Sequence, residues 1–312
     1  MTARVLRDVP DRTYHRDEVE PGAPPTLSRS CAWTLLTESP LHAYMFHPRL
    51  GGLSRKSTKA MDTGQLVHCL LLGQGPNVVV VRGFDDWRKD AARAQKKELL
   101  ATGALPILQK DLDEAEEIVA QVTPRLPFDL QSGITEATIL WEEFCGEGAP
   151  SDAADTHTPC RARLDHYEAG VISDIKCREE LNVKGFKREL EFNSHGIQPG
   201  IYVRGVEAAF PDLAGLVKFQ YVLLELSPPF CVVVIEVEGD RLMVGDRVWN
   251  HVVPRWADCL SSGVWPGPAS EVVREVPTWE AMRWMSTMQG GGGEELDDDA
   301  KAAKFEGFFS ED

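Results

Sequence analysis

The stretch Arg161-Ala-Arg-Leu-Asp-His-Tyr-Glu-Ala-Gly-Val-Ile-Ser-Asp-Ile-Lys176 predicts two strands joined by a tight turn. Residues 162–166 and 170–176 alternate or run apolar as half-buried strands do, and Glu168-Ala169-Gly170 between them is a turn signal. Residues two apart on a strand share a face, so Asp174 and Lys176 point the same way, and Asp165 can meet them from the neighbouring strand. Two carboxylates and an amine therefore converge.

A lysine beside two carboxylates suits phosphodiester hydrolysis. Carboxylate oxygens hold Mg²⁺ or Mn²⁺, the ion polarises a phosphate and acidifies a bound water, and the lysine orients that water or screens developing charge. A surface ion pair between Asp174 and Lys176 is the alternative, because a D-x-K tripeptide is common. The two charges interrupt the apolar series Val171, Ile172 and Ile175, however, and charged groups that enter a sheet core usually have a partner or a metal ion.

A further candidate ligand lies in Met61-Asp-Thr-Gly-Gln-Leu-Val-His68-Cys-Leu-Leu-Leu-Gly73, which predicts a buried helix because it is apolar on nearly every side. Asp62 or Thr63 can cap this helix, and Gly73 can end it. A histidine inside such a helix needs a partner, either a metal ion or a backbone carbonyl. Gly64, one helical turn before His68, would let another backbone approach closely.

Two more elements carry candidate site residues. Thr135-Glu-Ala-Thr-Ile-Leu-Trp141 predicts a strand that carries Glu136, because it is rich in β-branched residues. Gln198 and Tyr202, in Gln198-Pro-Gly-Ile-Tyr202, are four residues apart and would share one helix face. Proline is tolerated only in the first turn of a helix, so Pro199 requires this helix to begin near Gln198.

The order of these motifs resembles the PD-(D/E)XK nuclease superfamily, and within it the relatives of exonuclease VIII (RecE) and of the RecB nuclease domain. The matching elements are the G-x-x-x-H helix with Gly64 and His68, the D-x-K strand with Asp174 and Lys176, and the Q-x-x-x-Y element with Gln198 and Tyr202. Leu27-Ser-Arg-Ser, Ser39-Pro40 and Trp265-Pro-Gly267 also stand where that family carries similar strings. The resemblance covers roughly residues 26–267.

This resemblance implies an α/β fold of the restriction-endonuclease type, with a central mixed sheet flanked by helices. It implies a Mg²⁺- or Mn²⁺-dependent exodeoxyribonuclease that degrades linear double-stranded DNA processively from 5′ to 3′ and supplies single strands for recombination. Relatives form rings around DNA and work with a single-strand annealing protein, so a homo-oligomer and such a partner are expected. A catalytically silent module that binds DNA or protein, and a RecB-like or Cas4-like nuclease of other polarity or an endonuclease, remain as alternatives.

The resemblance also implies roles for single residues. His68, as a neutral imidazole, Asp165 and Asp174 would bind the metal, and Glu136 would contact it through water unless it is an exposed strand carboxylate. Lys176 would activate the water beside the two catalytic aspartates, and Gln198 and Tyr202 would orient the substrate. Arg161 and Arg163 lie beside Asp165 in the sequence, so we expect them to hold the substrate phosphate if they face inward.

Length and composition indicate one α/β domain with tails, because 312 residues of which 43% are hydrophobic can bury one substantial core. Residues 1–25 are polar and Pro-rich, which predicts a loosely ordered lead. We expect the nuclease domain at residues 26–288, and a flexible Gly-rich linker with an acidic tail at residues 289–312. Residues 217–226 and 230–238 predict further strands, and residues 248–262 an amphipathic helix. The sequence has no apolar stretch of about 18 residues and no signal-peptide pattern at its start, so we expect a cytoplasmic protein that does not cross a membrane.

Cysteine spacing bears on the expected cofactor, and net charge bears on the expected binding of DNA. The seven cysteines are scattered singly, so we expect reduced thiols and no iron-sulfur cluster. A net charge of −16 is the chief objection to DNA binding, because basic surface supplies most of the affinity for phosphates. A local basic strip would be enough for a substrate that threads a channel, and Arg88 to Lys97 is the candidate. An ordinary solvated helix face is the alternative.

Overall fold

The computed structural model describes residues 3–53, 59–126, 128–130, 132–145 and 157–268, with the backbone alone for residues 59–62. Its centre is a seven-stranded mixed sheet in the order β1 (Arg4–Leu6), β5 (Ile134–Phe144), β6 (His157–Glu168), β7 (Val171–Arg178), β8 (Lys218–Glu225) and β9 (Val232–Val237). β7 and β8 are parallel, the other neighbours are antiparallel, and the short β2 (Leu27–Ser28) pairs in parallel with β6. The expected central mixed sheet is confirmed.

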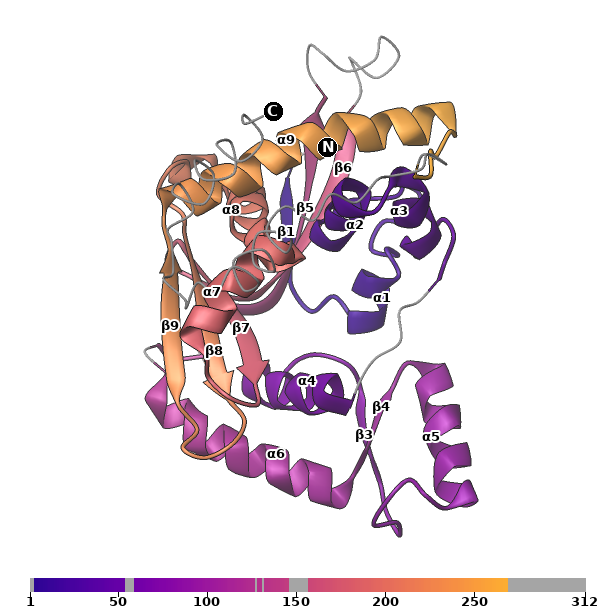
Figure 1. Ribbon diagram of the computed structural model, residues 1–312, viewed down its shortest axis with the longest axis vertical. Helices are drawn as coiled ribbons and strands as arrows, with labels where there is room; N and C mark the ends of the chain where they lie inside the picture. The colour runs from indigo at the N-terminus through magenta and orange to yellow at the C-terminus, as the bar shows by residue number, and fades with distance from the viewer. Residues whose placement is uncertain (1–2, 54–58, 127, 131, 146–156, 269–312) are drawn as a thin grey trace, which may run out of the picture. The chain divides into compact units, whose positions relative to one another are not determined.

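Helices cover both faces of this sheet, because alternate side chains of its strands are apolar on each side (Figure 1). Tyr221 and Leu223 face a core shared with α2 (Arg29–Thr37), α3 (Pro40–Phe46), α7 (Val183–Phe192), α8 (Gln198–Ala209) and α9 (Gly239–Ser262). Val222 and Leu224 face the opposite core, shared with α4 (Lys59–Leu72) and α6 (Gln109–Val122). Parallel strands need a crossover, and α7 and α8 provide it between β7 and β8.

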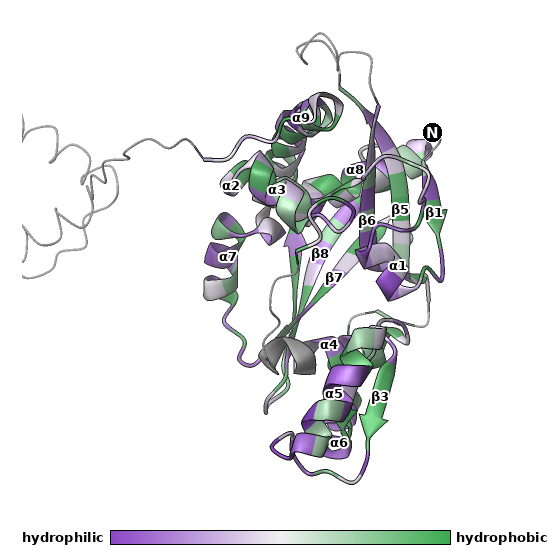
Figure 2. Ribbon diagram, turned by 90° about the vertical axis from the view of Figure 1, so that its right-hand side faces the viewer, coloured by the Kyte–Doolittle hydropathy of each residue, from purple (hydrophilic) through white to green (hydrophobic). Residues whose placement is uncertain are grey.

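A smaller two-stranded parallel sheet extends the α4 and α6 side of the molecule. It pairs β3 (Val78–Val81) with β4 (Leu105–Leu108), and α5 (Asp90–Thr102) is the crossover between them. The two strands pack into the core shared by α4 and α6, whereas α5 has Ala92 as its one buried residue. Figure 2 shows hydrophilic residues over much of the surface of α5, and Figure 1 shows α5 next to β3 and β4. We call residues 74–108 the small-sheet lobe.

Residues 3–25 contribute a strand and a helix to the fold, whereas the composition of residues 1–25 predicted a loosely ordered lead. β1 pairs with β5, and α1 (Asp11–His15) follows it. Asp17 is only 2% exposed, accepts a hydrogen bond from the Thr26 backbone N–H at 2.9 Å, and forms an ion pair with Arg161 at 2.6 Å. The polar composition suggested disorder, but these polar groups find charged partners more than a hundred residues away in the chain.

α8 and α9 cross so closely that glycine is required at the contact. A Cβ atom on Gly200 would lie 2.6 Å from the Asp246 backbone nitrogen, and one on Gly245 would lie 2.6 Å from the Ile197 carbonyl oxygen. Real Cβ atoms do not make contacts this short, so the two backbones meet directly. The crossing fixes the first turn of α8, in which Gln198 lies.

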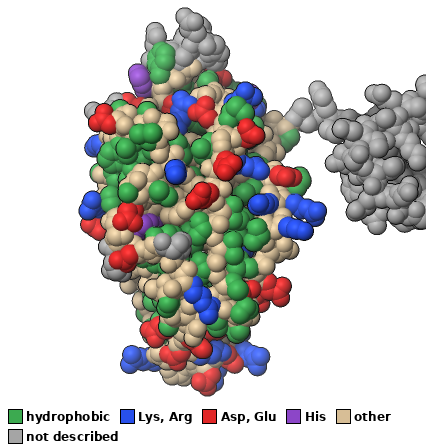
Figure 3. All heavy atoms as spheres, turned by 90° about the vertical axis from the view of Figure 1, so that its left-hand side faces the viewer, with side chains coloured by type: hydrophobic (Ala, Val, Ile, Leu, Met, Phe, Trp, Pro, Cys, Tyr) green, Lys and Arg blue, Asp and Glu red, His purple; other side chains and the backbone are tan. Residues whose placement is uncertain are grey.

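β9 is an edge strand of the central sheet. Within the described residues only β8 pairs with it, and its sequence Val-Val-Val-Ile-Glu-Val is mostly half-buried. Met243 and Val244, in the first turns of α9, are exposed near this edge. Figure 3 shows hydrophobic side chains gathered on this face of the molecule.

Most predictions of single elements are confirmed, with shifted boundaries. The strands expected at residues 217–226 and 230–238 are β8 and β9, and the helix expected at 248–262 is the second part of the longer α9. α4 begins at Lys59, before the expected caps Asp62 and Thr63. Within the described residues no helix is both long and apolar enough to cross a membrane. The expected linker and tail at 289–312, and the domain end at 288, lie outside the described residues.

Candidate active site

The β6–β7 hairpin predicted from the sequence is present, and it opens where the acids begin. Ala169 and Gly170 form its two-residue turn, both with positive φ, as the twist of a tight hairpin demands. The two strands pair only from His166 and Ser173 to the turn. Beyond that point the Asp165 carboxylate accepts the Ile175 backbone N–H at 2.7 Å. A side chain thus replaces the next ladder bond, and β6 and β7 diverge.

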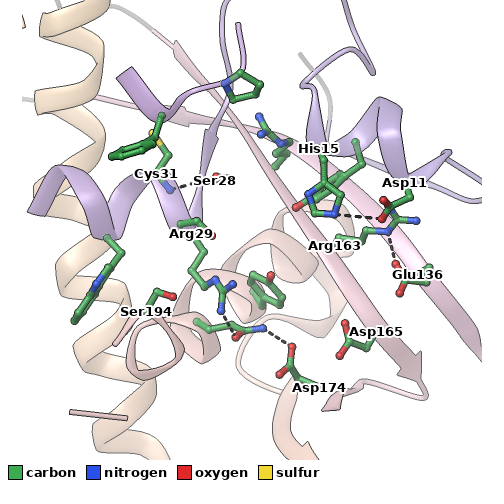
Figure 4. Close-up of a pocket in the computed structure, with 18 of the residues that line it drawn as sticks. Asp11, His15, Ser28, Arg29, Cys31, Glu136, Arg163, Asp165, Asp174 and Ser194 are labelled. Atoms are coloured by element: carbon green, nitrogen blue, oxygen red, sulfur yellow. Dashed lines mark hydrogen bonds and ion pairs between the residues drawn. The ribbon is translucent and has the colours of Figure 1, made fainter. Parts of the chain in front are cut away.

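A cavity of about 780 Å³ lies where the two strands diverge. Its lining comes from α1, α2, α4, β5, β6, β7 and α8, so segments from across the sequence meet there. Figure 4 shows Glu136, Asp165 and Asp174 grouped on one side of it, with Arg29 reaching in from α2. All nine residues singled out in the sequence line this cavity: His68, Glu136, Arg161, Arg163, Asp165, Asp174, Lys176, Gln198 and Tyr202.

His68, Glu136 and Asp165 form the cluster that can hold a metal ion. The His68 Nε2 atom lies 3.1 Å from an Asp165 oxygen, and its Nδ1 atom lies 3.4 Å from a Glu136 oxygen. One ligand atom from each residue lies within 4.8 Å of the others. Gly64 permits this approach of α4, because a Cβ there would already be 3.3 Å from Cys177 on β7. The alternative partner for His68, a backbone carbonyl, is not the one it has in the structure, since both ring nitrogens lie next to carboxylates.

Glu136 reaches the cluster through an unusual backbone conformation. Its φ is +51°, in the left-handed region that costs an L-residue energy, and it is left out of the β5–β6 ladder between two paired neighbours. The residue is 6% exposed, so the alternative of an exposed strand carboxylate is wrong. Its side chain forms an ion pair with Arg163 as well as with His68.

The ionisable groups of the cluster influence one another. Burial alone would raise the pKa of Asp165, but the charges of His68 and Lys176 outweigh it and hold that pKa at about 2. Burial favours neutral His68, yet the Asp165 and Glu136 carboxylates outweigh burial and raise its pKa. Burial, and then the Asp165 charge, raises the pKa of Glu136. A metal ion bound to a His68 ring nitrogen would compete with a proton there, and the raised pKa strengthens that competition.

Asp174 and Lys176 form a buried ion pair next to this cluster. The Asp174 residue is 2% exposed and the Lys176 side chain 15%, so the alternative of a surface ion pair is wrong. The Gln198 amide donates a hydrogen bond to the other Asp174 oxygen (Figure 4). Burial raises the pKa of Asp174, and the Lys176 charge opposes it. Asp174 thus lies beside the three-residue cluster and is not one of its members in this structure.

The helix that carries Gln198 and Tyr202 begins where the position of Pro199 predicted. α8 begins at Gln198 with Pro199 in its first turn, and both named residues are buried against the cavity. Tyr202 packs edge-on to Phe219, and burial raises its pKa well above the ordinary value. Tyr202 is therefore a neutral phenol at physiological pH.

Arg29 is a cavity residue that the sequence reasoning did not assign. One of its terminal nitrogens donates to Gln198 Oε1 at 2.7 Å and lies 2.8 Å from His195 Nδ1. Burial and the charges of Lys176 and Arg29 lower the pKa of His195 to about 3, so that ring accepts from Arg29 as a neutral imidazole. The Arg29 Nε–H is buried with no hydrogen-bond partner in the described residues. The string Leu27-Ser-Arg-Ser was the available signal, because Ser28 caps α2 and so fixes Arg29 at its first turn.

Arg161 and Arg163 line the cavity, but acids already neutralise both. Arg161 pairs with Asp17 at 2.6 Å, and Arg163 pairs with Glu136 and lies 3.5 Å from Asp11. Both guanidinium groups also lie over the Tyr14 ring. Their expected role in holding a phosphate stays a prediction, and in this structure they anchor the N-terminal segment.

The donor set fits a divalent cation. Two carboxylates and one imidazole converge within reach of a single ion. Carboxylates suit Mg²⁺ and Mn²⁺, and imidazole suits transition metals such as zinc, iron and nickel. The cluster could therefore hold a divalent metal ion.

Comparisons with known proteins support the fold. No protein-family model matches the sequence, and no curated protein matches it either. The structure is similar to the crystal structure of a protein from Eubacterium rectale named "Putative exonuclease", with a TM-score of 0.55. The alignment covers 89% of this chain and 98% of that one at 14% sequence identity. At this identity the similarity shows a shared fold.

Proposed function

We propose that this protein is a metal-dependent deoxyribonuclease of the PD-(D/E)XK type, similar to exonuclease VIII (RecE) and to the RecB nuclease domain. The observation that carries the proposal is the meeting of His68, Glu136, Asp165, Asp174 and Lys176 in one cavity. Structural ion pairs alone do not need three carboxylates within one site, because like charges repel in a region of low dielectric. A bound cation would relieve that repulsion.

Each part of the cavity has a task in phosphodiester hydrolysis. A bound Mg²⁺ or Mn²⁺ supplies the polarisation of the phosphate and the acidification of a water. Lys176 orients the attacking water and stabilises charge that develops on the phosphate. Gln198 holds Asp174 in place through its amide. The Arg29 Nε–H, which has no hydrogen-bond partner among the described residues, gives the phosphate a buried donor, and Tyr202 also lines the cavity.

We propose linear double-stranded DNA as the substrate, degraded from its 5′ end to leave single strands for recombination. Support comes from the order of the family motifs in the sequence and from the fold shared with the protein named "Putative exonuclease". Processive action by a homo-oligomer, and cooperation with a single-strand annealing protein, belong to the same proposal. A RecB-like or Cas4-like enzyme of other polarity would use the same cavity.

The test is digestion of matched DNA substrates by the full chain. Linear duplex labelled at the 5′ or 3′ end and a covalently closed circle are incubated with Mg²⁺, with Mn²⁺ or with EDTA. We expect metal-dependent loss of the 5′-labelled strand and no attack on the circle. Cutting of the circle would indicate an endonuclease, and loss of the 3′-labelled strand the other polarity. No digestion with either metal would favour the catalytically silent module.

Two variants with matched controls connect the activity to the cavity. Asp174→Asn and Lys176→Met should each lower the rate at least about 100-fold, the usual contribution of such a group. Asp212→Asn and Lys218→Met remove the same charges at exposed positions and should leave the rate unchanged. Full activity in either cavity variant would overturn the proposal.

A further inference from the structure

Basic side chains form a line along α5, in the small-sheet lobe. Lys89, Arg93 and Lys97 are four residues apart, so they lie above one another on a single helix face, and all three are exposed. We call these three residues the α5 stripe. It belongs to a chain whose net charge is −16, so this concentration of positive charge opposes the average of the surface.

The stripe is poorly neutralised by the protein itself. Arg93 pairs with Asp90, but both side chains are largely exposed, and exposed pairs of this kind contribute little. Within the described residues, Lys89 and Lys97 form no ion pair that the structure shows. A phosphate could replace the Asp90 contact at small cost.

The position of Lys89 is unfavourable for the helix. It is the N-cap residue of α5, and its side chain makes no capping hydrogen bond. A positive charge at a helix N-terminus opposes the helix dipole, and the last turn of α5, where lysine would help, has no basic residue. Residues that break a local rule without a structural gain often serve a function.

The small-sheet lobe meets the rim of the cavity at two places, at its start and at the end of α5. The Arg12 side chain donates to the Thr102 carbonyl oxygen at 3.0 Å, where α5 ends, and its neighbour Asp11 lines the cavity. Gly75 and Pro76, at the start of the lobe, also line the cavity. The stripe therefore leads away from the cavity rim, and Figure 1 shows α5 on the outer side of β3 and β4, below α1.

We propose that the α5 stripe binds the phosphate backbone of the duplex ahead of the end that is being degraded. The inference rests on the proposed function and names how that site holds the rest of its substrate. Eight residues of helix rise about 12 Å, the rise of roughly three to four base pairs. Contacts of lysine and arginine with phosphates carry no sequence information, as a nuclease that moves along DNA requires.

The salt dependence of binding tests the proposal. The probe is a duplex closed at both ends by hairpins, so it offers backbone but no end, and its affinity for the full chain is measured by fluorescence anisotropy in EDTA from 50 to 200 mM salt. Lys89→Gln with Lys97→Gln should reduce the slope of log affinity against log salt by about 1.8, at 0.9 per lost contact. The affinity change over that salt range should shrink about 12-fold.

A matched control lies on α9, which packs on the other face of the sheet. Arg247 and Arg255 are also exposed, eight residues apart on one helix, and Arg247→Gln with Arg255→Gln removes the same charge. This control should keep the wild-type slope. An equal loss of slope in both double variants would show a general effect of net charge and overturn the proposal, as would an unchanged slope in the α5 variant.

Digestion separates this proposal from the proposed function. On a linear duplex of about 30 base pairs the α5 variant should need more DNA for half-maximal rate, while its rate at saturation stays as in the wild type, because the stripe lies outside the cavity. If the wild type digests DNA and the α5 variant behaves like it in both assays, the proposal for the α5 stripe is wrong and the proposed function stands. If the wild type digests no DNA with either metal, the proposed function fails.

Discussion

Removal of the Lys176 charge should damage stability and activity in separable ways. In Lys176→Met the Asp174 carboxylate keeps the hydrogen bond from Gln198 but loses its counter-charge, while remaining 2% exposed. Removal of one partner of a buried ion pair typically costs about 3 to 5 kcal/mol of unfolding free energy. We expect a loss near the lower figure, because Gln198 still stabilises one carboxylate oxygen.

The double variant Asp174→Asn with Lys176→Met should recover most of that stability. Asparagine can still accept the Gln198 hydrogen bond, and no buried charge is left without compensation. Replacement of a whole buried ion pair by neutral groups is often close to neutral, so we expect the double variant within about 1 kcal/mol of the wild type. The coupling between the two positions would then be about 2 kcal/mol or more. Activity should stay lost in both variants.

The assay is urea denaturation in EDTA, followed by tryptophan fluorescence, together with the digestion rate on end-labelled duplex. EDTA is needed because a bound metal would itself compensate Asp174 and mask the effect. Recovery of stability without recovery of activity would assign the Asp174–Lys176 pair a catalytic task beyond its structural one. The reasoning is refuted if Lys176→Met unfolds like the wild type, or if the stable double variant digests DNA at the wild-type rate.

Three further outcomes follow from the described geometry. Gly200→Ala should lower the unfolding free energy by about 1 to 3 kcal/mol, because its Cβ would clash with the α9 backbone, and an unchanged melting temperature would contradict the close crossing. Burial, with the Arg161 charge, lowers the pKa of His47 to about 4 from an ordinary 6.5, so between these pH values the folded state binds fewer protons than the unfolded state. The unfolding free energy should therefore fall by about 3 kcal/mol as the pH drops from 6.5 to 4. Denaturation at stepped pH should show this fall in the wild type and a smaller one in His47→Gln. Glu136→Gln should weaken Mn²⁺ binding about tenfold or more in calorimetry, and an unchanged dissociation constant would remove Glu136 from the metal cluster.

Local sequence patterns predicted the elements that position the site. The alternation around Asp174 and Lys176 placed both on one strand face, and a proline in the first turn of α8 placed the start of that helix. These predictions succeeded because a strand or helix repeats over a few residues, and the signal is contained in them.

Local sequence patterns could not predict ion pairs between residues far apart in the chain. Arg163 was expected to face a phosphate, but in the structure it pairs with Glu136 and lies near Asp11 from the N-terminal segment. No periodicity indicates which of several acids an arginine will meet across more than a hundred residues. The left-handed φ of Glu136 was equally hidden, because tertiary contacts alone hold an L-residue in that conformation within a strand.

The meeting of Gly200 and Gly245 has a consequence for the history of this chain. Where two backbones touch, neither position accepts a methyl group unless its counterpart moves, so drift is blocked at both positions together. Descendants of a common ancestor should keep this pair of glycines long after the surrounding surface has changed. In an alignment of such descendants we expect glycine at both positions even where the overall identity is low, and a larger residue at one position with no change at the other would contradict this.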